Sequence, residues 1–146
     1  MSACLRCTVE AHHAAFAWSL DHGDVAGLMT LFGDDAEYDN GRVVLRGAAE
    51  LSAWFTARAT AVRTTRHVWS SLRLGDHLGD GVVTATSVWT CYAANGPAPH
   101  CTVGVSLVAD FDDRFEIGPT GGLLLQRRRI SGVFSDPALA PPAVPT

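Results

Sequence analysis

The sequence has no run of apolar residues that approaches the ~20 needed to cross a bilayer. Its first residues, which include Glu10, His12 and His13, lack the charged lead and the apolar stretch of a secretory signal. Positive charge is scarce as well, because 11 Lys and Arg residues face 15 Asp and Glu residues, for a formal net charge of −4. The one basic run, residues 127–129, has no interleaved aromatic residues. We therefore expect a cytoplasmic protein that has neither a membrane nor a nucleic acid as its partner.

Cysteine is also rare, with four residues in the chain. Cys4 and Cys7 form one C-x-x-C motif, and the sequence contains neither a second such pair nor the βαβ pattern that would favour metal or redox chemistry. Cys91 and Cys101 flank a predicted hairpin and are candidate cross-strand neighbours, which a reducing cytoplasm would keep as thiols. No metal site is predicted.

What the chain does have is a high apolar content, 47% hydrophobic against 18% charged over 146 residues. This length gives room for one domain with one core. The composition is more apolar than that of an average soluble domain, which suits a lined cavity or a surface covered by another subunit. We expect residues 1–8 to form a lead, residues 9–135 the domain, and residues 136–146 a disordered tail.

Helical spacing of apolar residues dominates the first part of the chain. It predicts a helix over residues 9–20 that stops at Gly23. It also predicts a second helix, which Asp24 caps and Gly33 ends, and a third helix over residues 48–62.

Strand patterns account for the rest. The turn Asp39-Asn40-Gly41 predicts a short hairpin, with arms 36–38 and 42–45, between the second and third helices. Beyond residue 62, apolar residues alternate in four long segments separated by turns that contain Gly or Pro: 67–74, 82–93, 101–117 and 123–134. Hairpin-length connections make these segments an antiparallel meander, and strands of this length must coil strongly. The expected fold class is α+β: three N-terminal helices packed on a strongly curved antiparallel sheet, which together form a cone around an apolar pocket.

Five polar residues are not explained by turns or helix caps. His67 opens the first long strand, on the same face as Trp69. Asp110 follows an apolar run, where a carboxylate costs several kcal/mol unless it is paired or solvated by a cavity. The other three are Asp21, Tyr38 and Tyr92. We expect the five to converge on the pocket, and the predicted substrate-binding residues are Tyr92, Trp69, Trp54 and Phe16.

The remaining histidines and arginines have simpler interpretations. His12, His13 and His22 are expected at exposed or terminal positions of the first helix. At least one arginine of the run 127–129 must point inward, because these residues alternate faces on a strand. A lone histidine in a strand is more often a hydrogen-bonded core residue, so His67 gains significance only from its expected neighbours.

Several short motifs occur in an order and at a spacing that resemble those of a known family. They are LDHGDV at 20–25, LFGDDAEY at 31–38, Gly47 at the start of a helix, and TRH at 65–67. Over residues 9–135 the chain resembles the SnoaL-like branch of the nuclear transport factor 2-like superfamily, which includes scytalone dehydratase, bile-acid dehydratases, polyketide cyclases, ketosteroid isomerase and limonene epoxide hydrolase. The resemblance implies a cone-shaped α+β barrel, an apolar pocket, catalysis by side chains without metal or organic cofactor, and a homodimer or higher homo-oligomer.

The resemblance also implies site residues. Asp21, Tyr38 and His67 fall on positions that look functional in scytalone-type dehydratases. The chain departs from these enzymes at Leu20, where they carry a tyrosine, and near Tyr92, where they carry a second acidic or imidazole group. Dehydration, isomerisation and cyclisation therefore all stay open.

The expected mechanism is general acid/base catalysis by His67, whose unperturbed pKa near 6.5 allows proton transfer in both directions. Asp21 would fix its tautomer, and the two tyrosines would donate hydrogen bonds to an enolate-like oxygen. Asp110 would be a second base, its pKa raised by apolar walls.

The expected function is that of a cofactor-independent dehydratase, isomerase or cyclase that acts on a small, largely apolar polyketide-, steroid- or terpenoid-like molecule. Two alternatives stay open. One is a module that binds such a molecule without turning it over. The other is a structural partner that resembles the β subunit of ring-hydroxylating dioxygenases.

Overall fold

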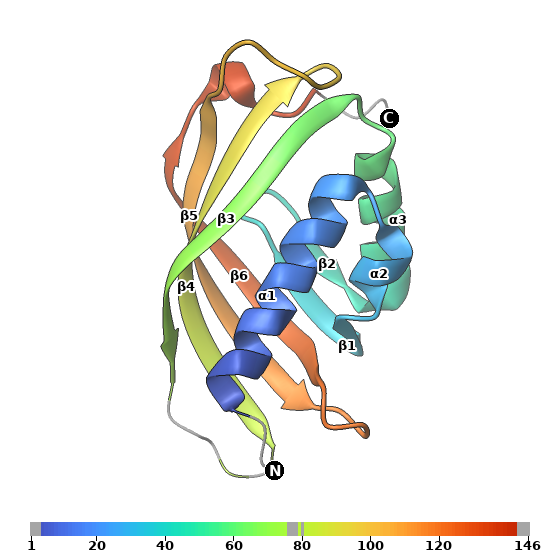
Figure 1. Ribbon diagram of the computed structural model, residues 1–146. Coiled ribbons are helices and arrows are strands. Elements are labelled where there is room, and N and C mark those ends of the chain that lie inside the picture. Colours follow the sequence, from blue (N-terminus) through green and yellow to red (C-terminus); the bar gives the residue numbers. More distant parts are fainter. Residues whose placement is uncertain (1–3, 76–78, 80, 143–146) are drawn as a thin grey trace.

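The computed structural model of the protein describes residues 4–75, 79 and 81–142. Three α-helices cover one face of a single curled sheet (Figure 1). The elements, in chain order, are α1 (Leu5–His22), α2 (Val25–Met29), β1 (Phe32–Asp39), β2 (Val44–Arg46), α3 (Gly47–Ala59), β3 (Arg63–Leu74), β4 (Val82–Asn95), β5 (Val105–Ile117), β6 (Leu123–Ser135) and the short 3₁₀ helix η1 (Pro137–Leu139). The predicted α+β fold class is confirmed.

The sheet has six strands in the order β2-β1-β6-β5-β4-β3. Its strands β3 to β6 form the predicted antiparallel meander, and each is 12 to 14 residues long. The strand β1 joins this meander parallel to β6, so the sheet is mixed rather than purely antiparallel. The long strands twist strongly in Figure 1, so the sheet curls around the helices without closing into a barrel.

The helix α1 lies against the concave face of the sheet, alongside β3 (Figure 1). Its buried stripe includes Val9, Phe16 and Leu20, as the helical spacing predicts. Gly23 ends α1 in the left-handed conformation, with φ 68°, and its N–H donates to the Ser19 carbonyl. The Asp24 side chain then accepts a hydrogen bond from the Gly27 N–H and caps α2, so both predicted boundary residues are confirmed.

The predicted end of the second helix is wrong. The helix α2 ends at Met29, and Phe32 and Gly33 are the first residues of β1. The Phe32 ring packs 6.2 Å from Phe16 and 5.8 Å from Phe55, and the Leu125 N–H donates to the Leu31 carbonyl at 2.8 Å. Pairing with β6 and burial of Phe32 thus override the helical spacing, which is a weak local preference.

The two ends of the domain also differ from expectation. The helix α1 begins at Leu5, inside the predicted lead. Residues 137–139, predicted to be disordered, form η1, and Arg63 donates to the Leu139 carbonyl at 2.6 Å. This contact holds η1 on the sheet, while residues 143–146 of the predicted tail lie outside the described residues.

Candidate active site

His67 and Asp21 form a close ion pair between β3 and the last turn of α1. The Nδ1 atom of His67 lies 2.5 Å from one Asp21 carboxylate oxygen, Oδ1. The backbone N–H of His67 donates to the other oxygen at 2.8 Å, and the Thr65 hydroxyl donates to Oδ1 at 2.7 Å. Asp21 therefore accepts three hydrogen bonds from the beginning of β3. The side chain of Asp21 is 4% exposed, and that of His67 is 12% exposed.

Local sequence explains why this pair forms. The helix α1 runs for five turns, and Asp21 lies in its last turn, two residues before the left-handed Gly23 turns the chain away. Thr65 and His67 are two residues apart in β3, so their side chains share the face that α1 covers. The end of α1 and the start of β3 thus bring the Asp21 carboxylate next to the side chains of Thr65 and His67.

The charges of the pair stabilise each other. Burial alone would lower the pKa of His67, but the hydrogen bond that His67 donates to Asp21, the Cys91 thiol and the Asp21 charge together raise it above its ordinary value. Burial would raise the pKa of Asp21, but the hydrogen bonds and the charge of His67 lower it. The imidazolium–carboxylate form is therefore favoured over the neutral pair. Because Nδ1 is engaged with Asp21, Nε2 is the nitrogen left to exchange a proton with a ligand.

Tyr38 is buried but does not join this pair. Its ring packs among Phe32, Trp54 and Phe55, at centroid distances of 5.6 to 6.2 Å. Burial raises the pKa of the phenol, which keeps it protonated and able to donate a hydrogen bond. Within the described residues no contact joins Tyr38 to His67, so the structure does not bring these two predicted site residues together.

Asp110 and Tyr92 point to the opposite face of the sheet from His67. Asp110 is exposed, and Tyr92 keeps 38% of its surface exposed. The neighbouring residues Ala109 and Cys91 are the ones that face the helices, because side chains alternate along a strand. The prediction that Asp110 and Tyr92 face the pocket is therefore wrong by one residue in each strand.

The inward carboxylate of β5 is Asp113, for which the sequence predicted no role. It is fully buried and accepts two hydrogen bonds from the Arg128 guanidinium, from Nε at 2.7 Å and from Nη2 at 2.8 Å. Burial raises the pKa of Asp113, and the Arg128 charge counteracts this shift. Arg128 is the inward arginine of the run 127–129, so the prediction that at least one of them points inward is confirmed.

Arg128 lies among aromatic rings. Its guanidinium carbon is 4.3 Å from the centroid of Phe16, 4.9 Å from Phe111 and 5.5 Å from Trp89. Phe16, a predicted substrate-binding residue, thus covers a cation in the interior.

The helix α1 adds two buried histidines to this cluster, which corrects the expectation that His12 and His13 are exposed. Trp89 donates to the Ser87 hydroxyl at 2.9 Å, which leaves the Ser87 proton free to donate to Nε2 of neutral His13 at 3.2 Å. Burial and the Arg128 charge lower the pKa of His12 to about 4 and that of His13 to about 3. Both rings are therefore neutral at physiological pH.

Aromatic side chains connect the two polar clusters across the concave face. Trp69 lies two residues from His67 on β3, and its ring centroid is 5.5 Å from that of His13. Trp89 faces Trp69 across the β3–β4 pair. Trp54 packs at the far side, against Tyr38. Trp69 and Trp54, two of the predicted substrate-binding residues, thus belong to the aromatic lining between the helices and the sheet.

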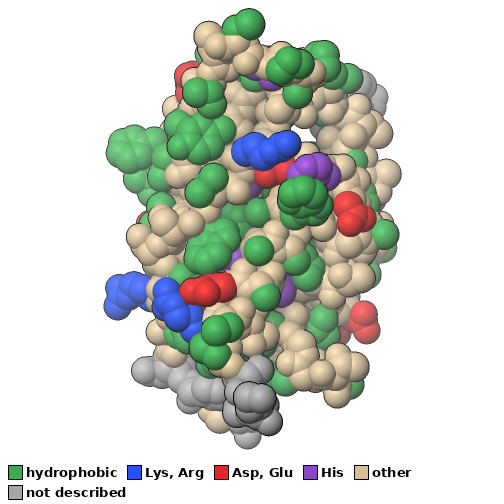
Figure 2. Space-filling view, in the orientation of Figure 1, with side chains coloured by type: hydrophobic (Ala, Val, Ile, Leu, Met, Phe, Trp, Pro, Cys, Tyr) green, Lys and Arg blue, Asp and Glu red, His purple; other side chains and the backbone are tan. Residues whose placement is uncertain are grey.

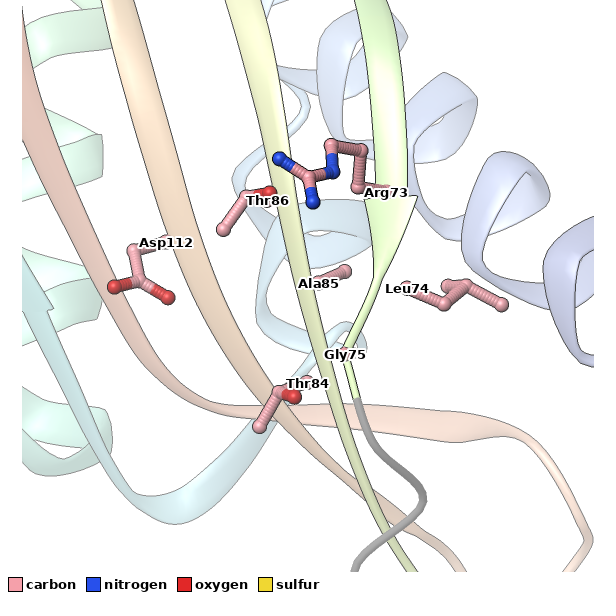
Figure 3. A pocket seen from close by; sticks show the side chains of 7 residues that line it. All are labelled: Arg73, Leu74, Gly75, Thr84, Ala85, Thr86 and Asp112. Carbon is pink, nitrogen blue, oxygen red and sulfur yellow. The ribbon is translucent and has the colours of Figure 1, made fainter.

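Two hollows lie beside the sheet. One, of about 260 Å³, is shown in Figure 3, where Thr84 and Thr86 extend from β4 on the side opposite to Leu74, and Asp112 lines the hollow from β5. The other, of about 180 Å³, is lined by Arg66 and Tyr92 among others, and also by Thr65, the residue that donates to Asp21. Neither hollow is lined by His67 or Asp21.

The cysteines offer no metal site. Cys4 and Cys7 are exposed, and the Cys4 sulfur accepts the Cys7 N–H at the start of α1. Cys91 pairs with His67 and Leu107 across the sheet, not with Cys101, which lies outside the strands. Over residues 4–75, 79 and 81–142, no group of three or more His, Cys, Asp or Glu side chains is arranged to hold a metal ion.

The distribution of charge on the surface and the hydropathy of the helices can be read from the structure. Figure 2 shows charged side chains scattered singly or in small groups over the helix-bearing face, with no broad basic area. Within the described residues, no helix combines the length and the apolar character that a membrane span requires.

Comparisons with known proteins place this geometry in a family. A family model described as the SnoaL-like domain matches residues 2–129. No curated protein matches the chain. Among solved structures, ActVI-ORFA from Streptomyces coelicolor superposes with a TM-score of 0.77, at 22% identity over 88% of this chain and 96% of its own.

Two further structures are similar. A candidate scytalone dehydratase from Novosphingobium aromaticivorans has a TM-score of 0.77, at 17% identity over 90% of this chain and 85% of its own. A protein from Catenulispora acidiphila, solved in complex with S-DNPA, has a TM-score of 0.76, at 19% identity over 90% of this chain and 95% of its own. At such identities the structural likeness shows the fold alone. The family match covers nearly the whole sequence, however, and with it the chain belongs to the SnoaL-like domain family.

Proposed function

We propose that this protein is a cofactor-independent general acid/base enzyme, with His67 as its proton-transfer group, that acts on a small and largely apolar carbonyl or hydroxy compound. The observation that carries the proposal is the His67–Asp21 pair. A carboxylate that binds both Nδ1 and the backbone N–H of one histidine fixes the orientation and the tautomer of that ring. It leaves Nε2 to move the proton.

The raised pKa of His67 favours the acid role. Near neutral pH more of the imidazole is protonated than in a free histidine, so it can donate a proton to a departing hydroxyl group or to an enolate. After the transfer, the neutral ring can accept a proton from the substrate, and the Asp21 charge stabilises the imidazolium that forms. Dehydration of a β-hydroxy carbonyl compound and isomerisation of an unsaturated ketone both need this exchange.

The side chains around the His67–Asp21 pair support a small, largely apolar substrate. Trp69 is two residues from His67 on the same strand face, and Leu20 precedes Asp21 in α1. Only 12% of the His67 side chain is exposed, which limits access to a small ligand. A protein of the same fold from Catenulispora acidiphila was solved in complex with S-DNPA, which supports a bound ligand here.

The test is exchange of the α protons of 2-tetralone, a small apolar ketone, in deuterated buffer, followed by NMR. We expect the wild-type protein to accelerate exchange over buffer, and His67→Ala to reduce the acceleration by about 10²–10⁴-fold, the usual contribution of general acid/base catalysis. Far-UV circular dichroism checks that the variant keeps its fold.

Two outward residues provide matched controls. Asp110→Asn and Tyr92→Phe change polar side chains that point away from His67, so both variants should exchange within about threefold of wild type. The proposal fails if His67→Ala is as active as these controls.

A further inference from the structure

Cys91 lies directly across from His67 on the neighbouring strand. The register of β3 and β4 pairs the two residues, and side chains of opposed residues share a face with Cβ atoms about 5 Å apart. Cys91 is 8% exposed, and His67 contacts α1 through Asp21, so both side chains face the helices. A thiol, an imidazole and a carboxylate from β4, β3 and α1 therefore stand in one row.

The Cys91 thiol makes little contribution to the hydrogen bonding of the fold. Its hydrogen bond to the Tyr92 carbonyl is long, at 3.8 Å. The other three cysteines, Cys4, Cys7 and Cys101, are exposed and lie outside the strands of the sheet. Cys91 is paired with His67 across the two strands, and its thiol is one of the groups that raise the pKa of His67.

The order of the three groups is that of an activated nucleophile. A nucleophilic side chain next to a base, with a third group that orients the base, is the recurring arrangement in covalent catalysis. The thiolate is the reactive form of cysteine, and a neighbouring imidazolium stabilises it. Asp21 accepts from His67 Nδ1 and so stabilises the imidazolium that forms when the ring takes the thiol proton.

We propose that Cys91, His67 and Asp21 form a nucleophilic site whose thiol adds to small α,β-unsaturated carbonyl compounds. In this step His67 takes the proton from Cys91, and the sulfur forms a bond to the β carbon of the ligand. The electron pair of the carbon–carbon double bond moves to the carbonyl oxygen as an enolate. His67 then returns the proton to the α carbon, so the addition needs no oxidant, reductant or further reactant.

The ligand class follows from the chemistry of both partners. A thiolate is a soft nucleophile, and the β carbon of an unsaturated carbonyl compound is a soft electrophile. Such compounds are also the products of dehydrating β-hydroxy carbonyl compounds, so this inference deepens the proposed function and shares its His67.

The experiment uses the full chain with Cys4→Ser, Cys7→Ser and Cys101→Ser, which leaves Cys91 as the one thiol. Methyl vinyl ketone is the probe, the rate of addition is followed by intact mass, and peptide mapping locates the adduct. We expect the folded protein to react at Cys91 at least fivefold faster than the same chain unfolded in urea at the same pH. Adding His67→Gln should slow the folded reaction at least tenfold, whereas His22→Gln, at an exposed position at the end of α1, should leave the rate unchanged.

The inference is overturned if the folded chain reacts more slowly than the unfolded one, or if His67→Gln and His22→Gln react alike. Should His67→Gln lose the far-UV circular dichroism of its parent, Asp21→Asn serves for the same comparison, and the folded-against-unfolded ratio decides without either variant. Adduct formation is a single event without turnover. Loss of 2-tetralone exchange with adduct formation retained therefore counts against the proposed function alone, and the reverse result counts against this inference alone.

Discussion

Arg128 and Asp113 form an ion pair in which both side chains are completely buried. The pair has two charge-assisted hydrogen bonds, of 2.7 and 2.8 Å, and aromatic rings surround the guanidinium. Its third nitrogen, Nη1, has no hydrogen-bond partner within the described residues. The interior of the domain thus depends on a carboxylate that neutralises a charge far from water.

Removing one member of this pair should cost more than removing both. Asp113→Leu leaves the Arg128 charge buried without a partner, which we expect to lower the free energy of unfolding by about 3–5 kcal/mol. Asp113→Leu combined with Arg128→Met removes both charges and fills the space with apolar atoms, so it should recover most of that loss. Urea denaturation of the two variants measures the difference. Equal destabilisation by both would show that lost packing, and not the unpaired charge, dominates.

The fold was largely predictable because periodicity reports local structure well. The four long strands are readable from alternation, and the first helix is readable from helical spacing. Gly23 ends α1 and Asp24 caps α2, so these two residues mark the boundary between the first two helices. The parallel pairing of β1 with β6 was not readable, since it joins residues about 90 apart in the sequence and depends on the burial of Phe32.

The site was predictable only in part, for a different reason. Asp21 and His67 meet because they mark a helix end and a strand start, positions that short motifs identify. It was harder to predict which side chains of the long strands face the helices, because the strand register is irregular between Val108 and Ala109 and between Arg114 and Phe115. Counting alternate residues inward from Phe111 would have selected Asp113 over Asp110.

Asp21→Asn should lower the pKa of His67. Without the carboxylate charge, burial acts with less opposition, so we expect the pKa of His67 to fall below its wild-type value. An NMR titration of the histidine ring protons measures this shift, with exposed His22 as the internal control. A His67 titration that the substitution leaves unchanged would show that Asp21 does not set the charge of the ring.

The same substitution should destabilise the protein in a defined pH window. The raised pKa of His67 means that its contribution to stability is fully present below about pH 6.5 and is lost as the pH rises through the folded-state value. The lowered pKa of Asp21 means that its contribution is present above about pH 3.8 and is lost as the pH falls through the folded-state value. The difference in unfolding free energy between wild type and Asp21→Asn should therefore be largest between about pH 4 and 6.5.

Acid should destabilise the protein through His12 and His13. Their folded-state pKa values of about 4 and about 3 lie below the ordinary 6.5, so the unfolded chain binds two protons that the folded chain excludes. The contribution of the two rings to the unfolding free energy should fall by about 2.7 kcal/mol per pH unit between roughly pH 6 and 4.5. Urea denaturation at several pH values measures this slope. His13→Gln should remove about half of it, whereas His22→Gln should leave it unchanged, and an equal slope in all three proteins would contradict the assignment.

We expect the protein to form a homodimer through the outer face of its sheet. Val68 and Phe134 belong to one cross-strand row of that face, and they are 52% and 69% exposed. Val105, near the start of β5, is 41% exposed. A second copy would shield these apolar side chains from water.

Light scattering after size-exclusion chromatography should give the dimer mass for the wild type and the monomer mass for Phe134→Asp. Trp18→Asp is the control, because Trp18 is 67% exposed on the helix side and should leave the dimer intact. A wild-type protein that runs as a monomer at tens of micromolar would overturn this prediction, since an outer face without a partner would then be stable in water.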